Sequence, residues 1–122
     1  MCYKITYKTN VPKIARKALY VYKTGGGTKN TFISTLYEYR YKKDELNKHI
    51  KIRVERIRTW VSVINQGYHS YTKPEARRLL KEYYTKIGLF EIPKGTLYYH
   101  AKGKIVIVSE QIIFRGWVTC VT

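Results

Sequence analysis

Acidic residues are scarce in this sequence. Only 8 Asp and Glu stand against 24 Lys and Arg, which gives a formal net charge of +16. The first 34 residues contain seven Lys or Arg and no acidic residue at all. Because such an excess attracts anions to the surface, it indicates an acidic partner: a nucleic acid, a nucleotide, an anionic membrane or an acidic protein. The alternative is a basic composition that comes from an A/T-rich genome, in which lysine codons abound.

Metal ligands and membrane segments are also scarce. Cys2 and Cys120 form no CxxC pair and the three histidines show no metal-ligand spacing, so no metal and no cofactor are expected. In a reducing cytosol both cysteines are expected to be free thiols; a disulfide between the chain ends is the alternative. No apolar run approaches the ~18 residues of a membrane helix, and the N-terminus lacks a signal-peptide core. These absences predict a cytoplasmic protein without a membrane partner.

The length and hydrophobicity of the chain predict one folded domain over residues 1–122. At 122 residues and 44% hydrophobic content, the chain is long enough to bury a single core. Tyrosine dominates the aromatic residues, with 13 Tyr against 3 Phe and 2 Trp. Because a tyrosine packs its ring while keeping a hydroxyl for water or a ligand, this bias suits half-buried sheet faces and binding surfaces.

Apolar and polar residues alternate along much of the chain, as in strands. The stretch 18–23 is apolar on both faces, which indicates a central strand. Tyr37, Tyr39 and Tyr41 share one face, either for packing across strands or for stacking on bases. Residues 50–64 fit a helix or two strands, and their β-branched content favours strands with a bulge or turn near Arg56. Further strands are expected at 3–8, 35–42, 90–92, 97–100, 104–109, 112–114 and 117–121.

One helix is well signalled. Thr72 and Glu75 form a capping box, Pro74 suits the first turn, and Gly88 suits the end of a helix that extends to about residue 87. The predicted fold class is therefore α+β, with a mostly antiparallel curved sheet of five to seven strands and one main helix at about 73–87.

Three segments are candidate anion sites. The loop Gly25–Gly27 lies between Lys23 and Lys29 and could hold a phosphate, although a plain hairpin is the alternative. The cluster Gly67–Tyr71 precedes the helix, where free N–H groups favour an anion; packing of Tyr71 and His69 is the alternative. Arginine and lysine residues on the outer face of the helix and in the stretch 48–58 add positive charge. The candidate ligand-binding residues are Lys23, Lys29, Arg53, Tyr68, His69, Ser70, Tyr71, Arg77, Arg78 and Lys81.

Three segments of the C-terminal half carry a resemblance: Gly67–Tyr71 with its following helix, Ile92–Tyr99 and Val108–Ile113. Their order of strand, Gly-aromatic-His, helix, Ile-Pro-Lys-Gly-Thr, Val-Ser and Ile-Ile resembles a loose group of small proteins from bacteriophages and gut bacteria. The resemblance implies a phage-type accessory protein in the host cytoplasm. Proteins of this kind often antagonise host defence, by capping a protein or by sequestering a nucleotide signal.

A second resemblance, to the ADP-ribosyltransferase fold, is weaker. Tyr22, Ser70 and Glu110 stand where that fold carries its three strand residues. However, the first of them is a tyrosine, the Ser-Thr-Ser run is missing, and Glu110 belongs to no Q/ExE pattern. Glu110 is expected to end a strand, and an enzyme is not expected.

The sequence thus predicts a small basic protein that binds a phosphate-bearing ligand, either a nucleotide or a nucleic acid, without catalysis. The alternative is a protein-binding inhibitor of a host defence or nucleic-acid-processing protein, and a second alternative is the ADP-ribosyltransferase-like enzyme. Because sheet proteins with uncovered edges often pair, a homodimer is also considered.

Overall fold

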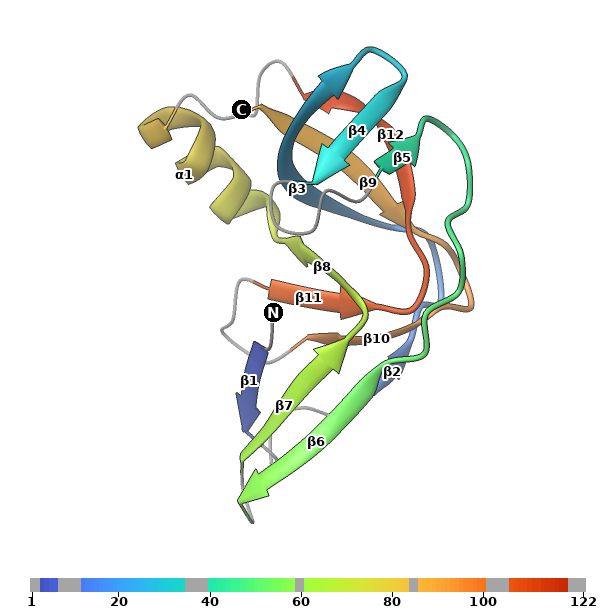
Figure 1. Cartoon of the computed structure of the whole chain (residues 1–122), viewed down its shortest axis with the longest axis vertical. Helices are drawn as coiled ribbons and strands as arrows, with labels where there is room; N and C mark the ends of the chain where they lie inside the picture. The colour runs from blue at the N-terminus through green and yellow to red at the C-terminus, as the bar shows by residue number, and fades with distance from the viewer. Residues whose placement is uncertain are drawn as a thin grey trace.

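The computed structural model describes residues 3–6, 12–34, 40–58, 61–83, 86–100 and 106–118. Within these ranges the chain is mostly antiparallel sheet with little helix (Figure 1). The single helix of the described part is α1 (Lys73–Tyr83). The strands are β1 (Tyr3–Thr6), β2 (Lys13–Ile14), β3 (Leu19–Thr28), β4 (Thr31–Ser34), β5 (Arg40–Lys42), β6 (Arg53–Arg58), β7 (Val61–Gln66), β8 (Tyr68–Tyr71), β9 (Ile87–Ile92), β10 (Leu97–His100), β11 (Val106–Ser109) and β12 (Ile113–Val118).

The strands form two sheets, and all pairings between named strands are antiparallel. The larger sheet has the order β12-β9-β3-β8-β11-β10-β2, with β4 paired to β3 and β5 paired to β4. The smaller sheet has the order β1-β7-β6. The antiparallel sheet that the alternation predicted is confirmed, but the described part holds more than the five to seven strands expected.

The chain passes from the smaller sheet to the larger one at Gly67, between β7 and β8. Gly67 has a φ of 136°, and a Cβ there would lie 2.5 Å from a side-chain carbon of Val108. Glycine tolerates both this backbone conformation and the close approach. The corner therefore positions β8 between β11 and β3.

Two glycines, one predicted in a loop and one at the helix end, lie inside strands instead. Gly25 is in β3 opposite Ser34, and Gly88 is in β9 opposite Lys23, so the predicted glycine loop and the predicted helix end are both wrong. The physical reason is Phe32, whose fully buried ring covers both positions. A Cβ on Gly25 would lie 2.7 Å from this ring, and a Cβ on Gly88 would lie 2.6 Å from it. The hairpin alternative is confirmed, because β3 and β4 pair around a turn at residues 29–30.

The core lies on the face of the large sheet that Phe32 covers. The Phe32 ring centroid is 4.8 Å from that of Phe90, 5.1 Å from that of Trp117 and 5.4 Å from that of Phe114. Tyr41 is 2% exposed and packs into the same cluster. Such aromatic contacts add stability beyond that expected from the area they bury. This aromatic cluster is therefore the main part of the hydrophobic core.

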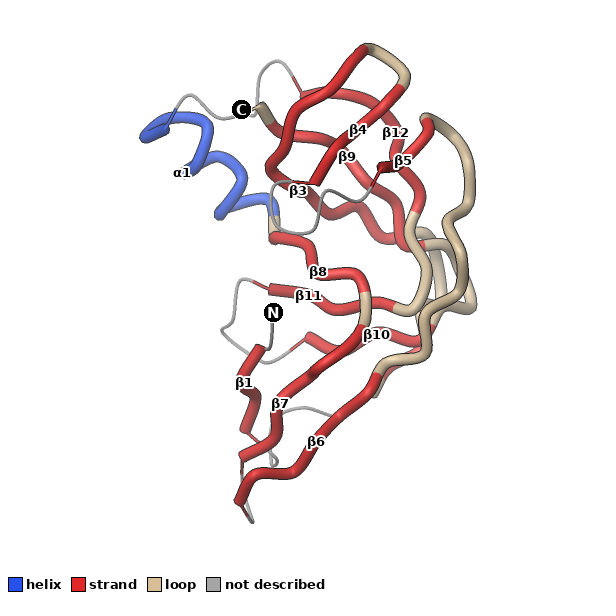
Figure 2. Tube along the Cα trace, in the orientation of Figure 1, coloured by secondary structure: helices blue, strands red, loops and turns tan. Residues whose placement is uncertain are grey.

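Helix α1 packs on the opposite face of the same sheet (Figures 1 and 2). Ala76 is fully buried there against Tyr22 of β3 and Ile87 of β9. The helix begins at Lys73 as predicted, and the Glu75 carboxylate accepts hydrogen bonds from Arg78. It does not extend to residue 87, because Ile87 already pairs with β3.

Within the ambiguous stretch 50–64, residues 50–52 lie outside the strands, whereas strands are confirmed from residue 53 on, where β6 and β7 pair. Their register shifts between Arg56 and Arg58, which confirms the predicted bulge. The two strands expected at 112–114 and 117–121 are instead one strand, β12, with an irregularity between Phe114 and Gly116. Several predictions fall outside the described residues: Cys2, Cys120, and the 35–39 part of the third strand with Tyr37 and Tyr39.

Residues 43–52, which we call the strap, connect β5 to β6 along one side of the molecule; Figure 2 draws them as an irregular segment. Backbone hydrogen bonds tie the strap to residues 110–114: Asp44 N to Phe114 O (2.8 Å), Asn47 N to Ile112 O (3.2 Å) and Ile50 N to Glu110 O (3.0 Å). No helix of the described part is long and apolar enough to cross a membrane.

Candidate functional site

Lys23 is one of the predicted ligand residues that the structure brings together in the interior. Its side chain is in the core, and its ammonium group donates a hydrogen bond to the backbone carbonyl of His69. The ammonium nitrogen lies 5.5 Å from the ring centroid of Tyr41 and 5.9 Å from that of Phe90. Burial lowers the pKa of Lys23 from 10.5 to about 7. Lys23 therefore connects β3 to β8 and does not present a charge to solvent.

His69 is half-buried beside this junction. Its Nδ1 lies 3.2 Å from the carbonyl oxygen of Gly67, and its Nε2 is buried without a hydrogen-bond partner among the described residues. Burial lowers the pKa of His69 below its ordinary value, and the charge of Lys23 lowers it further, while the Gly67 hydrogen bond acts in the opposite direction. The imidazole is therefore neutral at pH 7, with Nδ1 as donor.

The other side chains of the cluster are also engaged in the fold. Tyr68 is 3% exposed and donates its hydroxyl hydrogen to the carbonyl of Lys48 at 2.5 Å. Ser70 is 1% exposed, and its hydroxyl lies 3.3 Å from the carbonyl of Ile107. Tyr71 is half-buried opposite Tyr22. Because β8 lies in the middle of a sheet, the prediction of an open phosphate loop at 67–71 is wrong, and the packing alternative describes this segment.

The remaining predicted residues are far apart in the fold. Lys29 is exposed in the turn between β3 and β4, and Arg53 is exposed at the start of β6. Arg77 and Arg78 are exposed on α1, where Arg78 forms an ion pair with Glu75. The side chain of Lys81 lies outside the described part. The nine candidates whose side chains the structure describes therefore form no single site.

A different group of cations gathers where β2 meets the turn after β9. Ala15 N donates to Thr96 O (2.9 Å), and Gly95 N donates to Ala15 O (2.8 Å), which fixes this turn against the end of β2. Four exposed cations surround the contact, and we call them the β2 group: Lys13, Arg16, Lys17 and Lys94. Three of them, Lys13, Arg16 and Lys17, belong to the N-terminal stretch without acidic residues that the sequence shows. Lys94 comes close to them only because the turn after β9 pairs with the end of β2.

A second group of cations lies across the same face, on and next to the strap. This strap group consists of the exposed residues Lys48, Lys51 and Arg53. A row of neighbouring backbone segments leads from β2 to the strap, and its length gives the distance between the two groups. Ile14 pairs with Leu97, the carbonyl of Leu97 accepts a hydrogen bond from Glu110 N, and the carbonyl of Glu110 accepts one from Ile50 N. Three steps of about 4.8 Å place the two backbones roughly 14 Å apart.

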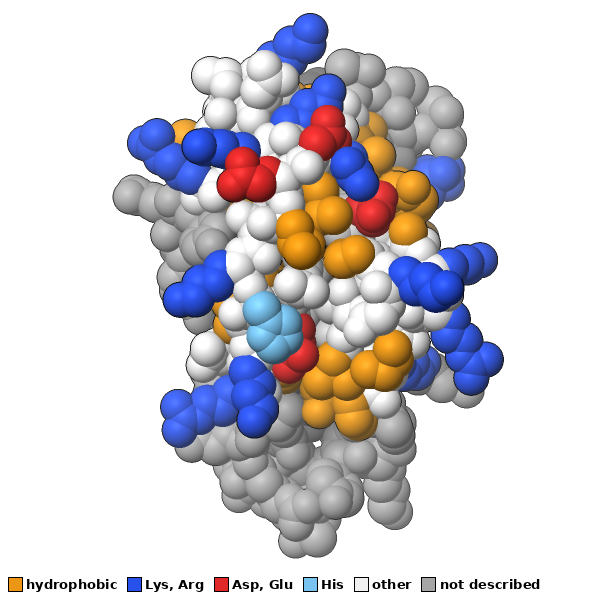
Figure 3. Space-filling view, turned by 90° about the vertical axis from the view of Figure 1, so that its right-hand side faces the viewer, with side chains coloured by type: hydrophobic (Ala, Val, Ile, Leu, Met, Phe, Trp, Pro, Cys, Tyr) orange, Lys and Arg blue, Asp and Glu red, His pale blue; other side chains and the backbone are white. Residues whose placement is uncertain are grey.

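Together the β2 group and the strap group form what we call the cationic face. Figure 3 views this side of the molecule and shows Lys and Arg side chains along both margins, with apolar side chains gathered between them. Ile14, at 55% exposure, is one of the apolar residues of the row between the groups. Two separated groups of exposed cations suit contact with a polyanion better than an enclosed small-molecule site, in which the polar groups converge.

The positive charge of the cationic face is not neutralised within the described part of the chain. The ion pairs there join Arg78 to Glu75, Arg115 to Asp44 and Glu91, and His49 to Glu110. None of these pairs uses a cation of the face. Glu110 is the acidic residue of the row, and its side chain is only 13% exposed. Unpaired cations this close together repel one another, and an anion that binds them relieves the repulsion.

Among the described residues, no group of three or more His, Cys, Asp or Glu side chains is placed to hold a metal ion. Glu110 directly follows β11, as expected, and its carboxylate contacts the ring of His49 and the backbone amide of Ile52.

No protein-family model matches the sequence, and no match was found among curated proteins or solved structures.

Proposed function

We propose that this protein binds nucleic acid, without catalysis, through the cationic face. The observation that carries the proposal is the pair of exposed cation groups, unpaired within the described residues, on either side of a row that is apolar except for Glu110. Double-stranded DNA carries one negative charge for each ~1.7 Å of its axis. A polymer of phosphates therefore reaches both groups at once, whereas the phosphates of one nucleotide reach only one of them.

The proposal is tested by the salt dependence of binding to a labelled oligonucleotide. The slope of log K against log salt is about −0.9 for each phosphate neutralised on B-DNA and about −0.7 on single strands. We expect a steep slope for the wild-type chain, whose face offers seven exposed cations. A shallow slope, or no binding at about 50 mM salt, contradicts the proposal.

A matched pair of double variants locates the site. Lys13→Gln with Lys17→Gln removes two charges from the β2 group, and Arg77→Gln with Arg78→Gln removes two from helix α1. We expect the first to weaken binding by on the order of 10- to 100-fold at 0.1 M salt and to reduce the slope by about 1.8 on duplex DNA. The helix variant changes the same net charge and should leave the slope unaltered. The reverse result would move the site to α1, whose outer face is one of the candidate anion sites of the sequence.

Other features of the protein stay predictions that accompany this proposal. They are the α+β class, the single domain over 1–122, the phage-type accessory role in a host cytoplasm, the antagonism of host defence and the homodimer. The protein-binding alternative is distinguished by co-purification of a specific host protein together with salt-insensitive binding.

A further inference from the structure

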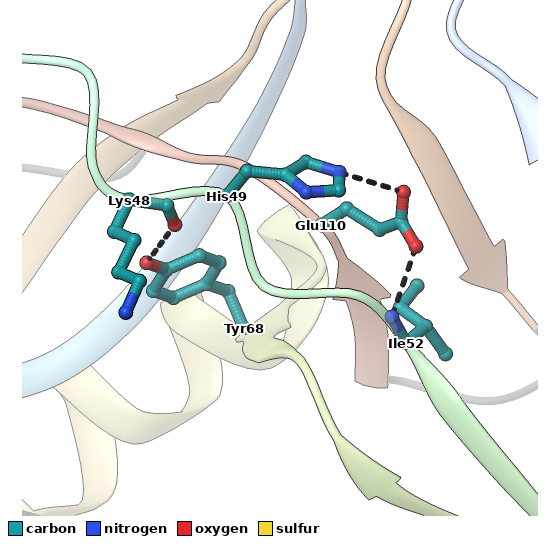
Figure 4. A network of polar contacts seen from close by, with 5 residues as sticks. All are labelled: Lys48, His49, Ile52, Tyr68 and Glu110. Carbon is teal, nitrogen blue, oxygen red and sulfur yellow. Dashed lines mark hydrogen bonds and ion pairs between the residues drawn. The ribbon is translucent and has the colours of Figure 1, made fainter.

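Glu110 is an acidic residue within the cationic face, and its carboxylate makes two contacts with the strap. Oε1 lies 3.0 Å from Nε2 of His49, and Oε2 accepts a hydrogen bond from the backbone amide of Ile52 at 2.9 Å (Figure 4). The side chain of Glu110 is largely buried, whereas that of His49 is 56% exposed. The carboxylate therefore faces the strap backbone.

The strap is anchored before its cations by Asn47, whose backbone and side-chain nitrogens both donate to the carbonyl of Ile112, and along residues 48–52 by further contacts. Ile50 N donates to the Glu110 backbone carbonyl, and Tyr68 donates its hydroxyl hydrogen to the Lys48 carbonyl (Figure 4). Lys51 stands between the two residues, Ile50 and Ile52, whose amides are both bonded to Glu110. The strap lies outside the regular strands and lacks a full ladder of hydrogen bonds. Loss of the Glu110 and Tyr68 contacts would therefore loosen residues 48–52, which carry Lys48 and Lys51, while Asn47 stays bonded to Ile112.

We infer, on the basis of the proposed function, that Glu110 is a positioning residue for nucleic-acid binding. Its carboxylate fixes the strap so that Lys48, Lys51 and Arg53 act together with the β2 group. Two effects of this carboxylate oppose each other, because its charge repels phosphate while its hydrogen bonds order the cations. The inference is that ordering outweighs repulsion, since ordering several cations in advance avoids the entropy loss of ordering them on binding.

Three variants that each remove one negative charge test this inference. Glu110→Ala removes the charge and both acceptors, Glu110→Gln removes the charge but keeps one acceptor oxygen, and Glu45→Ala removes a charge from an exposed strap residue. Electrostatics alone predicts tighter binding for all three. We expect Glu110→Ala to bind on the order of 10-fold more weakly than the wild type, with a salt slope reduced by about 1 to 2. Glu110→Gln should restore most of the affinity and slope, and Glu45→Ala should bind as tightly as the wild type or tighter.

A second variant, which changes no charge, distinguishes loss of the strap contact from a folding defect. Tyr68→Phe keeps the buried ring and every charge but removes the hydroxyl that anchors Lys48. It should weaken binding in the same direction as Glu110→Ala, with unchanged far-UV circular dichroism. Faster hydrogen exchange at the amides of Ile50 and Ile52 in Glu110→Ala should report the released strap without any ligand.

The outcomes separate the two claims. If the wild type binds oligonucleotide with a steep salt slope and Glu110→Ala binds as tightly as Glu110→Gln, the positioning role of Glu110 is wrong and the proposed function stands. If the wild type shows no salt-dependent binding, the proposed function fails and this inference fails with it, even when the exchange data show a released strap.

Discussion

The ammonium group of Lys23 on β3 is hydrogen-bonded to the backbone carbonyl of His69 on β8, inside an aromatic core. The ion pairs of the described residues include no carboxylate partner for it. Burying a cation without a counter-charge lowers the free energy of unfolding. Burial therefore favours the neutral amine and lowers the pKa of Lys23 to about 7. Near neutral pH the core therefore holds a lysine that is partly deprotonated.

This burial predicts a stability that depends on pH. Because the pKa of Lys23 falls from 10.5 to about 7 on folding, the unfolded chain binds more protons between those two pH values. The free energy of unfolding should therefore rise with pH in this window, by on the order of 1.4 kcal/mol per pH unit from this residue. Below pH 7 the lysine is charged in both states and its penalty is constant.

Lys23→Met should remove this contribution while keeping an apolar side chain of similar length. Denaturant titrations between pH 7 and pH 10 measure it as the difference in slope between the wild type and the variant. Other lysines and tyrosines titrate in both proteins and cancel in the comparison. Parallel curves would show that Lys23 is not desolvated.

The contact between Phe32 and the glycines predicts opposite effects for two adjacent substitutions. Gly25→Ala should destabilise the fold by about 1–3 kcal/mol, because the new methyl group collides with the Phe32 ring and with the carbonyl of Ile33 at 2.4 Å. Gly26→Ala is the matched control, since a Cβ there meets nothing within 4 Å. It should be neutral or stabilising by up to ~1 kcal/mol, through the entropy of the unfolded chain. Thermal unfolding of the two variants decides the matter, and similar losses in both would contradict the packing.

The width of the cationic face predicts how binding depends on ligand length. Affinity should rise with oligonucleotide length until the ligand spans both the β2 group and the strap group, roughly 14 Å apart at the backbone. A mononucleotide should give little thermal shift, since the shift follows the ratio of ligand concentration to Kd. Fluorescence anisotropy with a length series measures the first effect. Tight mononucleotide binding with no gain in longer ligands would instead favour the nucleotide-sequestering alternative.

The strands and the start of the helix were predictable because they depend on local pattern. The apolar faces of residues 18–23 predict a central strand, and β3 does lie between β8 and β9. The slip in alternation near Arg56 predicts the register shift that β6 shows. These features follow from side-chain period alone.

The glycines and the site were not predictable in the same way. A Gly-Gly-Gly run is typical of a loop, and only the ring of Phe32, brought across by β4, explains why Gly25 lies in a sheet. Likewise, the sequence indicates that His69 precedes a helix, but not that β8 lies between β3 and β11 in the sheet. The β2 group was missed because Lys94 is distant in sequence from Lys13 and meets it only through the contact of Ala15 with Gly95 and Thr96.

One aromatic ring that rests on two glycines from different strands links three positions that are distant in sequence. A methyl group at residue 25 or 88 would press on this ring, and at residue 25 also on the carbonyl of Ile33, so a large ring at residue 32 requires glycine at both positions. Relatives of this chain that keep an aromatic residue at position 32 should consequently keep both glycines, and that joint retention would mark the fold even where overall sequence similarity has been lost.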